Sequence, residues 1–306
     1  MKKLFILAGG YSKEREISLK TAKSVYQELK KDNNYKIKIQ EPTGNFIKNL
    51  RNFKPDKVLN LLHGRYGEDG YIQAILETEK FKYTHSGVLS SSLAMDKDIS
   101  KKIYIKNKIL TPKYLKFPFK KIINKNDFLK KIKKKIGFPL VIKPLNEGSS
   151  VNVFICNSKN IFKFMNKLEE YGEILIERYI PGREIQVAIL SEKILGAIEL
   201  KPKRKFYDYQ AKYDPKAKTE HIIPVDISNP QYSKVTNIAL KVHKLLKCRS
   251  ISRSDFRFYR NKFYLLETNT QPGMTSLSLV PEIAKFNNIT FKNLIEKILK
   301  DASINK

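Results

Sequence analysis

The chain has 306 residues, of which 41% are hydrophobic, and its 60 Lys and Arg against 30 Asp and Glu give a formal charge of +30. Length and hydrophobic content indicate a globular protein with room for two or three domains. No run of about 18 apolar residues occurs, which excludes a transmembrane helix, and the apolar start KKLFILAGG is too short for a signal peptide. Cys156 and Cys248 are far apart and form neither a disulfide framework nor a CxxC site, so we expect a cytoplasmic protein without membrane insertion.

The positive charge is spread along the whole chain, and its densest run, residues 130–135, is typical of the solvated face of a helix. Glycine and aromatic residues do not alternate with the basic ones as they do in RNA-binding motifs. We therefore expect weak attraction to polyanions and no specific nucleic-acid partner. A basic nucleic-acid-binding module is the alternative from a different class of protein.

The first expected element is a strand over residues 3–7, followed by a glycine turn and an amphipathic helix pattern over residues 17–29. Strand, turn and helix are typical of the beginning of a βαβ unit. The turn lacks the GxGxxG spacing and does not predict a dinucleotide site. Its Glu14 would lie at the carboxyl end of a strand, where open α/β sheets bind ligands. Alternatively, Glu14 is only a helix-start residue that offsets the helix dipole.

A second buried strand is expected over residues 58–62, and it runs into the loop HGRYGEDG before a helix that begins near Tyr71. Three glycines indicate a tightly constrained loop. Several ionisable side chains in such a loop, again at the carboxyl end of a strand, favour a functional role for His63 over a structural one. The crossing to the next domain is expected at residues 94–97.

A strand over residues 138–144 carries Lys143 close to its end and leads through the loop NEGSSV to a return strand. Backbone amides in a glycine loop form an anion-binding concavity, and a lysine adds a point charge, so this stretch predicts phosphate binding. It is not a P-loop, because GxxxxGK[ST] is absent. The next strand, over residues 174–190, is broken at Pro181-Gly182, which indicates a hinge between domains whose unpaired backbone groups meet an adenine edge.

Residues 203–223 form a long polar insertion with three tyrosines and no core periodicity. Long segments of this kind in compact proteins tend to be lids or disordered, and the aromatic content favours a lid that orders on closure. The pattern of residues 235–246 then predicts an amphipathic helix that packs on the following strands. Residues 291–299 predict a closing helix.

Two strand-like runs, residues 253–258 and 263–269, flank the polar turn of residues 260–262 and predict a hairpin. With a three-residue turn centred at position 261, Asp255 falls directly opposite Glu267. One pair of carboxylates would therefore meet on this hairpin.

Glu267 and Asn269 project to the same side of the strand, because side chains alternate along it. Together with Asp255 they supply hard oxygen ligands, which magnesium prefers, and magnesium bound by one or two carboxylates usually holds substrate phosphates as well. The alternative is that both acids are ordinary solvated strand residues and that residues 269–273 are simply a turn.

Eight motifs, in this order, closely resemble D-alanyl-D-alanine ligases, which are ATP-grasp enzymes: GGYSKEREIS, LHGRYGEDG, AMDK, VIKPLNEGSSV, ILIERYIPGRE, FYDYQAKY, SRSDF and LLETNTQPGMTSLSLVP. Each motif alone is weak, but eight in family order over nearly the full length are specific. The resemblance implies an α/β fold of three domains. These are an N-terminal Rossmann-like substrate domain (1–94), a central ATP-grasp subdomain (95–183) and a C-terminal ATP-grasp subdomain (184–306) with a lid loop at about 203–223 and the metal site.

The resemblance also implies the reaction, which is ligation of two D-alanines to D-alanyl-D-alanine for peptidoglycan synthesis. ATP first phosphorylates the carboxylate of one D-alanine, and the amine of the second attacks the D-alanyl phosphate, releasing ADP and phosphate. The implied cofactors are ATP and two Mg²⁺ ions, for which Mn²⁺ can substitute. The implied partners are D-alanine, ATP and a second copy of the chain in a homodimer.

By the family pattern, the nucleotide and metal would be bound by three groups of residues. The magnesium ions would be held by Asp255, Glu267 and Asn269. The phosphates would be neutralised by Lys97, Lys143 and the lid residue Lys212, and spreading this charge is the principal work in phosphoryl transfer. The adenine pocket would be lined by Glu177, Arg178 and Ile180, and the ribose hydroxyls bound by Glu184.

The substrates would be bound by a second set of residues, again by the family pattern. Glu14 would bind the ammonium group of the first D-alanine, with His63 close by. Ser149 and Tyr213 would orient Glu14 and the lid in one hydrogen-bonded group. Arg253 would stabilise the oxyanion of the tetrahedral intermediate. The carboxylate of the second D-alanine would be received by Gly273, Ser278 and Leu279.

Four residues depart from the family pattern: Gln210 replaces a Glu, Leu277 a His, and His85 and Ser250 each a Gly. None is a metal ligand or phosphate lysine, so they concern the lid and the second-substrate pocket rather than the reaction. The pair Lys212-Tyr213 resembles the D-alanine-specific type, which argues against a D-lactate acceptor. An ATP-grasp ligase that joins a different amino acid or hydroxy acid is the nearest alternative.

Overall fold

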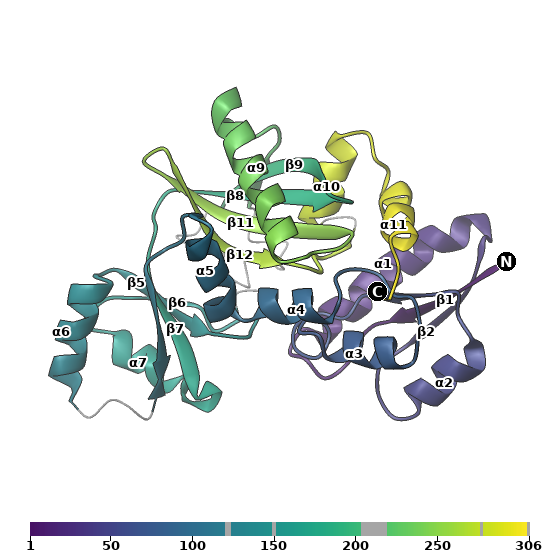
Figure 1. The fold of residues 1–306 in the computed structure, drawn as a ribbon, viewed down its shortest axis with the longest axis horizontal. Coiled ribbons are helices and arrows are strands. Elements are labelled where there is room, and N and C mark those ends of the chain that lie inside the picture. Colours follow the sequence, from purple (N-terminus) through teal and green to yellow (C-terminus); the bar gives the residue numbers. More distant parts are fainter. Residues whose placement is uncertain (120–123, 149–150, 203–218, 276–277, 305–306) are drawn as a thin grey trace.

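The computed structural model describes residues 1–119, 124–148, 151–202, 219–275 and 278–304, which form three sheets covered by helices (Figure 1). This arrangement confirms the α/β class. Within these ranges no helix is both long and apolar enough to cross a membrane.

The N-terminal sheet is parallel and has the strand order β2-β1-β3. Its elements are β1 (Lys2–Leu7), β2 (Tyr35–Gln40), β3 (Lys57–Asn60), α1 (Arg15–Leu29), η1 (Lys30–Asp32), α2 (Phe46–Phe53) and α3 (Tyr71–Thr78). Alternate residues of β1 face opposite sides: Leu4 and Ile6 share a core with α1, whereas Phe5 and Leu7 share one with α2 and α3. Because both faces are covered, the strand is apolar and buried from Leu4 to Leu7.

The central sheet is antiparallel, with the order β4-β7-β5-β6. Its elements are β4 (Tyr114–Pro118), α6 (Lys125–Lys135), β5 (Leu140–Pro144), β6 (Phe154–Cys156), α7 (Ile161–Asn166), η3 (Glu169–Tyr171) and β7 (Glu173–Arg178). Helix α6 buries Phe128 and Ile132 against this sheet and exposes the lysines of the dense basic run. That run is the solvated face of a helix, as its pattern predicts.

The C-terminal sheet is antiparallel, with the order β10-β9-β8-β11-β12. Its strands are β8 (Arg183–Leu190), β9 (Lys193–Lys201), β10 (Glu220–Ile222), β11 (Ile251–Tyr259) and β12 (Lys262–Asn269). The predicted break at Pro181-Gly182 is therefore the point at which the chain leaves the central sheet for this one.

Helices cover both faces of the C-terminal sheet. They are α4 (Val88–Met95), α5 (Lys97–Lys106), α9 (Asn229–Leu245), α10 (Leu279–Phe286) and α11 (Phe291–Lys300). Helix α9 starts at a capping box between Ser228 and Gln231 and packs on the strands that carry Asp255 and Glu267, as predicted. Tyr104 of α5 shares that core, although the sequence prediction assigns α5 to the central subdomain. The domain limits themselves stay a prediction.

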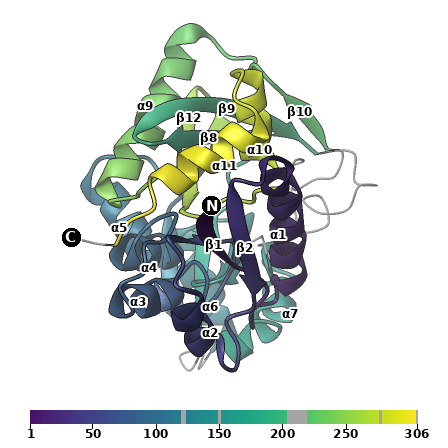
Figure 2. The same cartoon turned by 90° about the vertical axis from the view of Figure 1, so that its right-hand side faces the viewer.

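Helix α11 lies beside α1, so the end of the chain packs on the N-terminal sheet (Figures 1 and 2). Ser303 pairs with Tyr83 in an antiparallel bridge, and Tyr83 in turn pairs with Val58 of β3. The N-terminal and C-terminal parts are therefore joined by a continuous core.

The turn of the β11–β12 hairpin corrects one prediction. It has two residues, Arg260 and Asn261, both with left-handed φ (+46° and +56°), and Lys262 already pairs with Tyr259. A β-bulge shifts the register between Asp255 and Phe256, and this shift brings Asp255 opposite Glu267. The predicted carboxylate pair is confirmed, but the predicted three-residue turn is wrong.

Two of the departures from the family pattern lie where the backbone is left-handed. His85 has φ +69° and Ser250 has φ +62°, a region in which glycine carries no Cβ penalty. Ser250 is buried, and its hydroxyl has no hydrogen-bond partner among the described residues. The structure therefore explains why glycine suits both positions.

Ser250→Gly is expected to raise the free energy of unfolding by about 1 kcal/mol, because it relieves the left-handed strain and removes an unpaired buried hydroxyl. Urea denaturation measures this change. Ser191→Gly is the matched control, since Ser191 also has left-handed φ (+48°) but donates a hydrogen bond to Asp301 Oδ2 at 2.6 Å. Equal or lower stability of Ser250→Gly than of the parent chain would contradict this explanation.

Candidate active site

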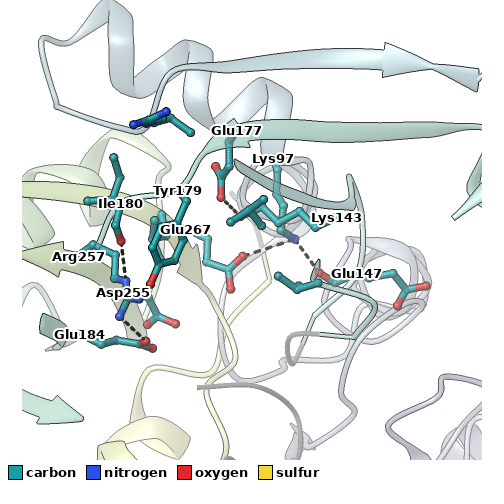
Figure 3. A pocket seen from close by; sticks show the side chains of 14 residues that line it. Lys97, Lys143, Glu147, Glu177, Tyr179, Ile180, Glu184, Asp255, Arg257 and Glu267 are labelled. Carbon is teal, nitrogen blue, oxygen red and sulfur yellow. Dashed lines mark hydrogen bonds and ion pairs between the residues drawn. The ribbon is translucent and has the colours of Figure 1, made fainter. Parts of the chain in front are cut away.

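A pocket lies between the central and C-terminal sheets, and most of the predicted nucleotide residues line it (Figure 3). They come from α5, from strands β5 and β7 of the central sheet and the loop after it, and from strands β8, β11 and β12 of the C-terminal sheet. Eight predicted site residues meet here: Lys97, Lys143, Glu177, Arg178, Ile180, Glu184, Asp255 and Glu267.

Two buried lysines occupy one side of this pocket (Figure 3). Lys97 is fixed at the start of α5, because Asp96 caps the helix by accepting hydrogen bonds from the amides of residues 98 and 99. Its Nζ donates to the Glu147 carbonyl at 2.6 Å and lies 3.5 Å from Glu267 Oε2. Strand β5 places Lys143 Nζ 2.6 Å from Glu177 Oε1.

The charge of Lys143 is maintained despite burial. Burial alone would lower the pKa of this ammonium, but the carboxylates of Glu177 and Glu267 outweigh it and raise the pKa. Lys143 is therefore a cation at neutral pH, as phosphate binding requires.

Arg257 is a pocket residue that the sequence interpretation missed. Its Nε donates to the Ile180 carbonyl at 3.2 Å, and its Nη1 lies 3.3 Å from Glu184 Oε2 (Figure 3). Arg257 thus fixes the predicted adenine and ribose residues relative to β11. Its place two residues after Asp255 was a usable signal, since residues two apart in a strand share a face.

The predicted metal residues lie together on the hairpin. Arg253 donates two hydrogen bonds to Asp255, from Nε to Oδ1 at 2.8 Å and from Nη2 to Oδ2 at 3.0 Å. Glu267 lies opposite Asp255 in the pairing of β11 with β12. Asn269 pairs with Arg253, and its Oδ1 accepts the amide of Gln271 at 2.7 Å. Two carboxylates and one amide oxygen fit a magnesium ion that is held jointly by protein and phosphates.

A second cluster surrounds Glu14 at the carboxyl ends of β1 and β3. Glu14 is buried and directly precedes α1. Gly64 has a left-handed φ of +69° and lies close to this carboxylate, since a Cβ on it would lie 2.6 Å from Glu14 Oε2. A Cβ on Gly148 would lie 3.0 Å from the same oxygen, so the loop after Lys143 reaches Glu14. The next residue of that loop, Ser149, lies outside the described residues, as do Lys212, Tyr213, Gln210, Leu277 and most of the predicted lid.

His63 lies in the same cluster and has partners on both ring nitrogens. Nδ1 is 3.1 Å from Glu68 Oε1, and Nε2 is 3.3 Å from the hydroxyl of Thr21. Burial opposes protonation, but the carboxylates of Glu68 and Glu14 outweigh it and raise the pKa of His63. Glu68 and Thr21 were missed, although Glu68 stands in the same charged loop.

Glu68→Gln is expected to lower the pKa of His63, which NMR titration of its ring protons measures directly. Because the pKa of His63 is raised in the folded state, its pairing with Glu68 stabilises the fold fully at pH values below the unfolded-state pKa of about 6.5. This stabilisation is lost as pH rises through the folded-state pKa. The variant should therefore lose roughly 1.5 kcal/mol of unfolding free energy at pH 6 and less at pH 9. Glu16→Gln, at an exposed position, is the control. A loss independent of pH would contradict the pairing.

The predicted second-substrate residues follow β12. A Cβ on Gly273 would lie 3.1 Å from Ser278 Oγ, and Leu279 begins α10, whose N-terminus favours a carboxylate. Gln271 ties this segment to β3: its Oε1 accepts from Asn60 Nδ2 at 2.9 Å, and its Nε2 donates to the carbonyl of the residue before His63. Asn60 and Gln271 were missed, although a polar residue inside the apolar run VLNLL was a signal.

Comparison with known proteins identifies the family of this chain. Residues 105–300 match the family model described as D-ala D-ala ligase C-terminus. The D-alanine–D-alanine ligase of Pelagibacter ubique (strain HTCC1062) is 63% identical over 305 residues, covering 100% of this chain and 99% of the relative. The chain belongs to the D-alanine–D-alanine ligase family. The resemblance of the eight motifs is thereby confirmed.

Solved structures show the same fold over nearly the whole chain. The D-alanine–D-alanine ligase from Bacillus anthracis complexed with ATP has a TM-score of 0.84 and 30% identity, covering 98% of this chain and 97% of that one. The VanG D-Ala:D-Ser ligase from Enterococcus faecalis has a TM-score of 0.80 and 26% identity, covering 98% of both chains. The ATP-grasp fold expected from the motifs is therefore confirmed.

Proposed function

We propose that this chain joins two D-alanines to D-alanyl-D-alanine in the cytoplasm for peptidoglycan synthesis, with cleavage of ATP to ADP and phosphate. One observation carries the proposal. Two buried lysines, Lys97 and Lys143, line one pocket with the acids Asp255 and Glu267, and the loop that follows Lys143 reaches Glu14. This arrangement supports a phosphate-binding site that would adjoin a site for an ammonium group.

The nucleotide would lie in this pocket with its base against the end of β7. Glu177, Arg178 and Ile180, which line the pocket, would contact the adenine, and Glu184, which pairs with Arg257, would bind the ribose hydroxyls. Lys97 and Lys143 supply positive charge to the phosphates. Lys212 is proposed to add a third cation there.

The metal site would be formed by Asp255, Glu267 and Asn269, whose hard oxygens suit Mg²⁺, as two ions, or Mn²⁺ in its place. When bound, such ions neutralise the charge that develops on the transferring phosphoryl group.

The first chemical step makes the carboxylate of D-alanine reactive. Glu14, with His63 beside it, would hold the ammonium group of the first D-alanine. A carboxylate oxygen then attacks the γ-phosphorus of ATP, so one O–P bond forms, the bond to the bridging oxygen breaks and ADP leaves. Ser149 and Tyr213 are proposed to orient Glu14 for this step.

The second step forms the peptide bond. The ammonium group of the second D-alanine gives one proton to water, and its nitrogen attacks the carbonyl carbon of the acyl phosphate; a second proton leaves the nitrogen as the amide forms and phosphate departs. Arg253, whose guanidinium is held in place by Asp255, would stabilise the oxyanion before phosphate leaves. Gly273, Ser278 and Leu279 would receive the carboxylate of this second D-alanine.

The proposal is tested by ADP release in the presence of D-alanine, with the product identified by mass. D-serine and D-lactate are tested as acceptors in the same assay, because a structural relative is a D-Ala:D-Ser ligase. Failure of D-alanine to stimulate ADP release would overturn the proposal. Sedimentation of the same sample tests the proposed homodimer, and gel shifts with DNA and RNA test the nucleic-acid-binding alternative.

A further inference from the structure

Lys101 is a completely buried lysine that the roles above do not use. It lies one turn after Lys97 on α5, behind the pocket rather than on its surface. Its Nζ is 2.9 Å from Glu177 Oε2, while Lys143 Nζ is 2.6 Å from Oε1 of the same carboxylate. Two buried cations therefore share one buried anion.

The position of Lys101 is fixed by further contacts. Its Nζ donates to the hydroxyl of Thr111 at 2.7 Å, and that hydroxyl donates to the Leu265 carbonyl of β12 at 2.8 Å. The ring of Tyr114 lies 5.6 Å from the same ammonium. The side chain of Lys101, which projects from α5, is thus held between the central sheet and the C-terminal sheet.

Burying this ammonium is costly. Burial, the largest effect, lowers the pKa of Lys101 to about 8; Lys143 acts in the same direction, whereas Glu177 and Glu267 oppose it. Replacing buried charges by apolar side chains of similar volume is often neutral or stabilising. The lysine is therefore poorly explained by packing, and its charge calls for a functional reason.

The charge balance around Glu177 supplies that reason. Lys143 and Glu177 alone would cancel, so this pair would contribute no net charge to the wall of the pocket. With Lys101 the group of three carries a net charge of +1. We propose that Lys101 is a positioning residue for nucleotide binding, which neutralises Glu177 from behind so that the charge of Lys143 acts on the phosphates. The inference rests on the proposed ATP site.

The test compares four charge balances with one readout, the ratio of ADP affinity to adenosine affinity, measured by calorimetry at fixed salt. Adenosine shares the base and ribose but lacks the phosphates, so the ratio reports the phosphate contribution alone. The balance is +1 in the parent chain, 0 in Lys101→Met, +2 in Glu177→Gln and +1 in the double variant.

The ratio is expected to follow this charge balance. It should fall about tenfold in Lys101→Met, rise about tenfold in Glu177→Gln, and return close to the parent value in the double variant, as expected for single charges near the pocket in a protein dielectric. Lys102→Met is the matched control, because it removes the same charge at the next residue, where the side chain is exposed and paired with Asp98. It should leave the ratio unchanged.

Two results would overturn the inference: an unchanged ratio in Lys101→Met, or a double variant whose ratio stays as low as that of Lys101→Met. If Lys101→Met does not fold, the comparison of Glu177→Gln with the double variant still isolates Lys101, and equal ratios there would also overturn it. Failure of the proposed function is distinguishable, because the parent chain would then show no D-alanine-dependent ADP release. Activity in the parent chain with unchanged ratios in the variants refutes only the role of Lys101.

Discussion

Glu267→Gln is expected to reduce turnover about a thousandfold while the chain stays folded, which corresponds to roughly 4 kcal/mol of lost transition-state stabilisation. The substitution keeps the shape of the side chain but removes the charge that faces Asp255 across the hairpin and lies 3.5 Å from Lys97. The loss should appear in kcat for ADP release, and thermal denaturation should show an intact fold.

The control is Lys262→Gln, which removes one charge from an exposed position of the same strand and should retain full activity. A Glu267→Gln chain that unfolds at lower temperature yet turns over at the parent rate would show that Glu267 is structural. The hairpin acids would then be ordinary strand residues.

Arg253→Met is expected to lower kcat about 500-fold with the KM for ATP changed less than about threefold, because removal of one oxyanion donor costs about 10²–10³ in kcat. Arg253→Lys should recover only part of the loss, since lysine keeps the charge but cannot form the two bonds that Asp255 accepts from the guanidinium.

Arg257→Met provides the contrast on the same strand. Arg257 contacts the Ile180 carbonyl and Glu184, so its loss should raise the KM for ATP rather than lower kcat. Steady-state kinetics at varied ATP separates the two outcomes. If both arginine variants change only the KM for ATP, Arg253 does not contact the reacting centre.

The sequence predicted best those features that depend on residues close together in the chain. Strand ends followed by glycine loops placed Glu14, His63 and Lys143 correctly near the carboxyl ends of β1, β3 and β5, because a strand and the loop that follows it are close together in the sequence. The break at Pro181-Gly182 was located correctly for the same reason, whereas its role as a hinge stays a prediction. It separates strands that belong to two different sheets.

Features that depend on the pairing of distant segments were predicted less well. The bulge on the hairpin brings Asp255 opposite Glu267, which a two-residue turn without a bulge would not do. No pattern in the sequence marks this bulge. Lys101 and Gln271 were missed because each finds its partner only after folding, at Glu177 and Asn60 respectively. A buried lysine on a helix cannot be told from a solvated one by spacing alone.

The proposed reaction has a chemical signature in its first step, in which the carboxylate oxygen of D-alanine becomes bonded to phosphorus. D-Alanine labelled with ¹⁸O in both carboxylate oxygens is incubated with ATP and the chain, and the released phosphate is analysed by mass. One ¹⁸O atom should appear in phosphate for each D-alanyl-D-alanine formed, with ADP as the nucleotide product. Phosphate without the label, or label recovered in AMP, would contradict the D-alanyl phosphate route.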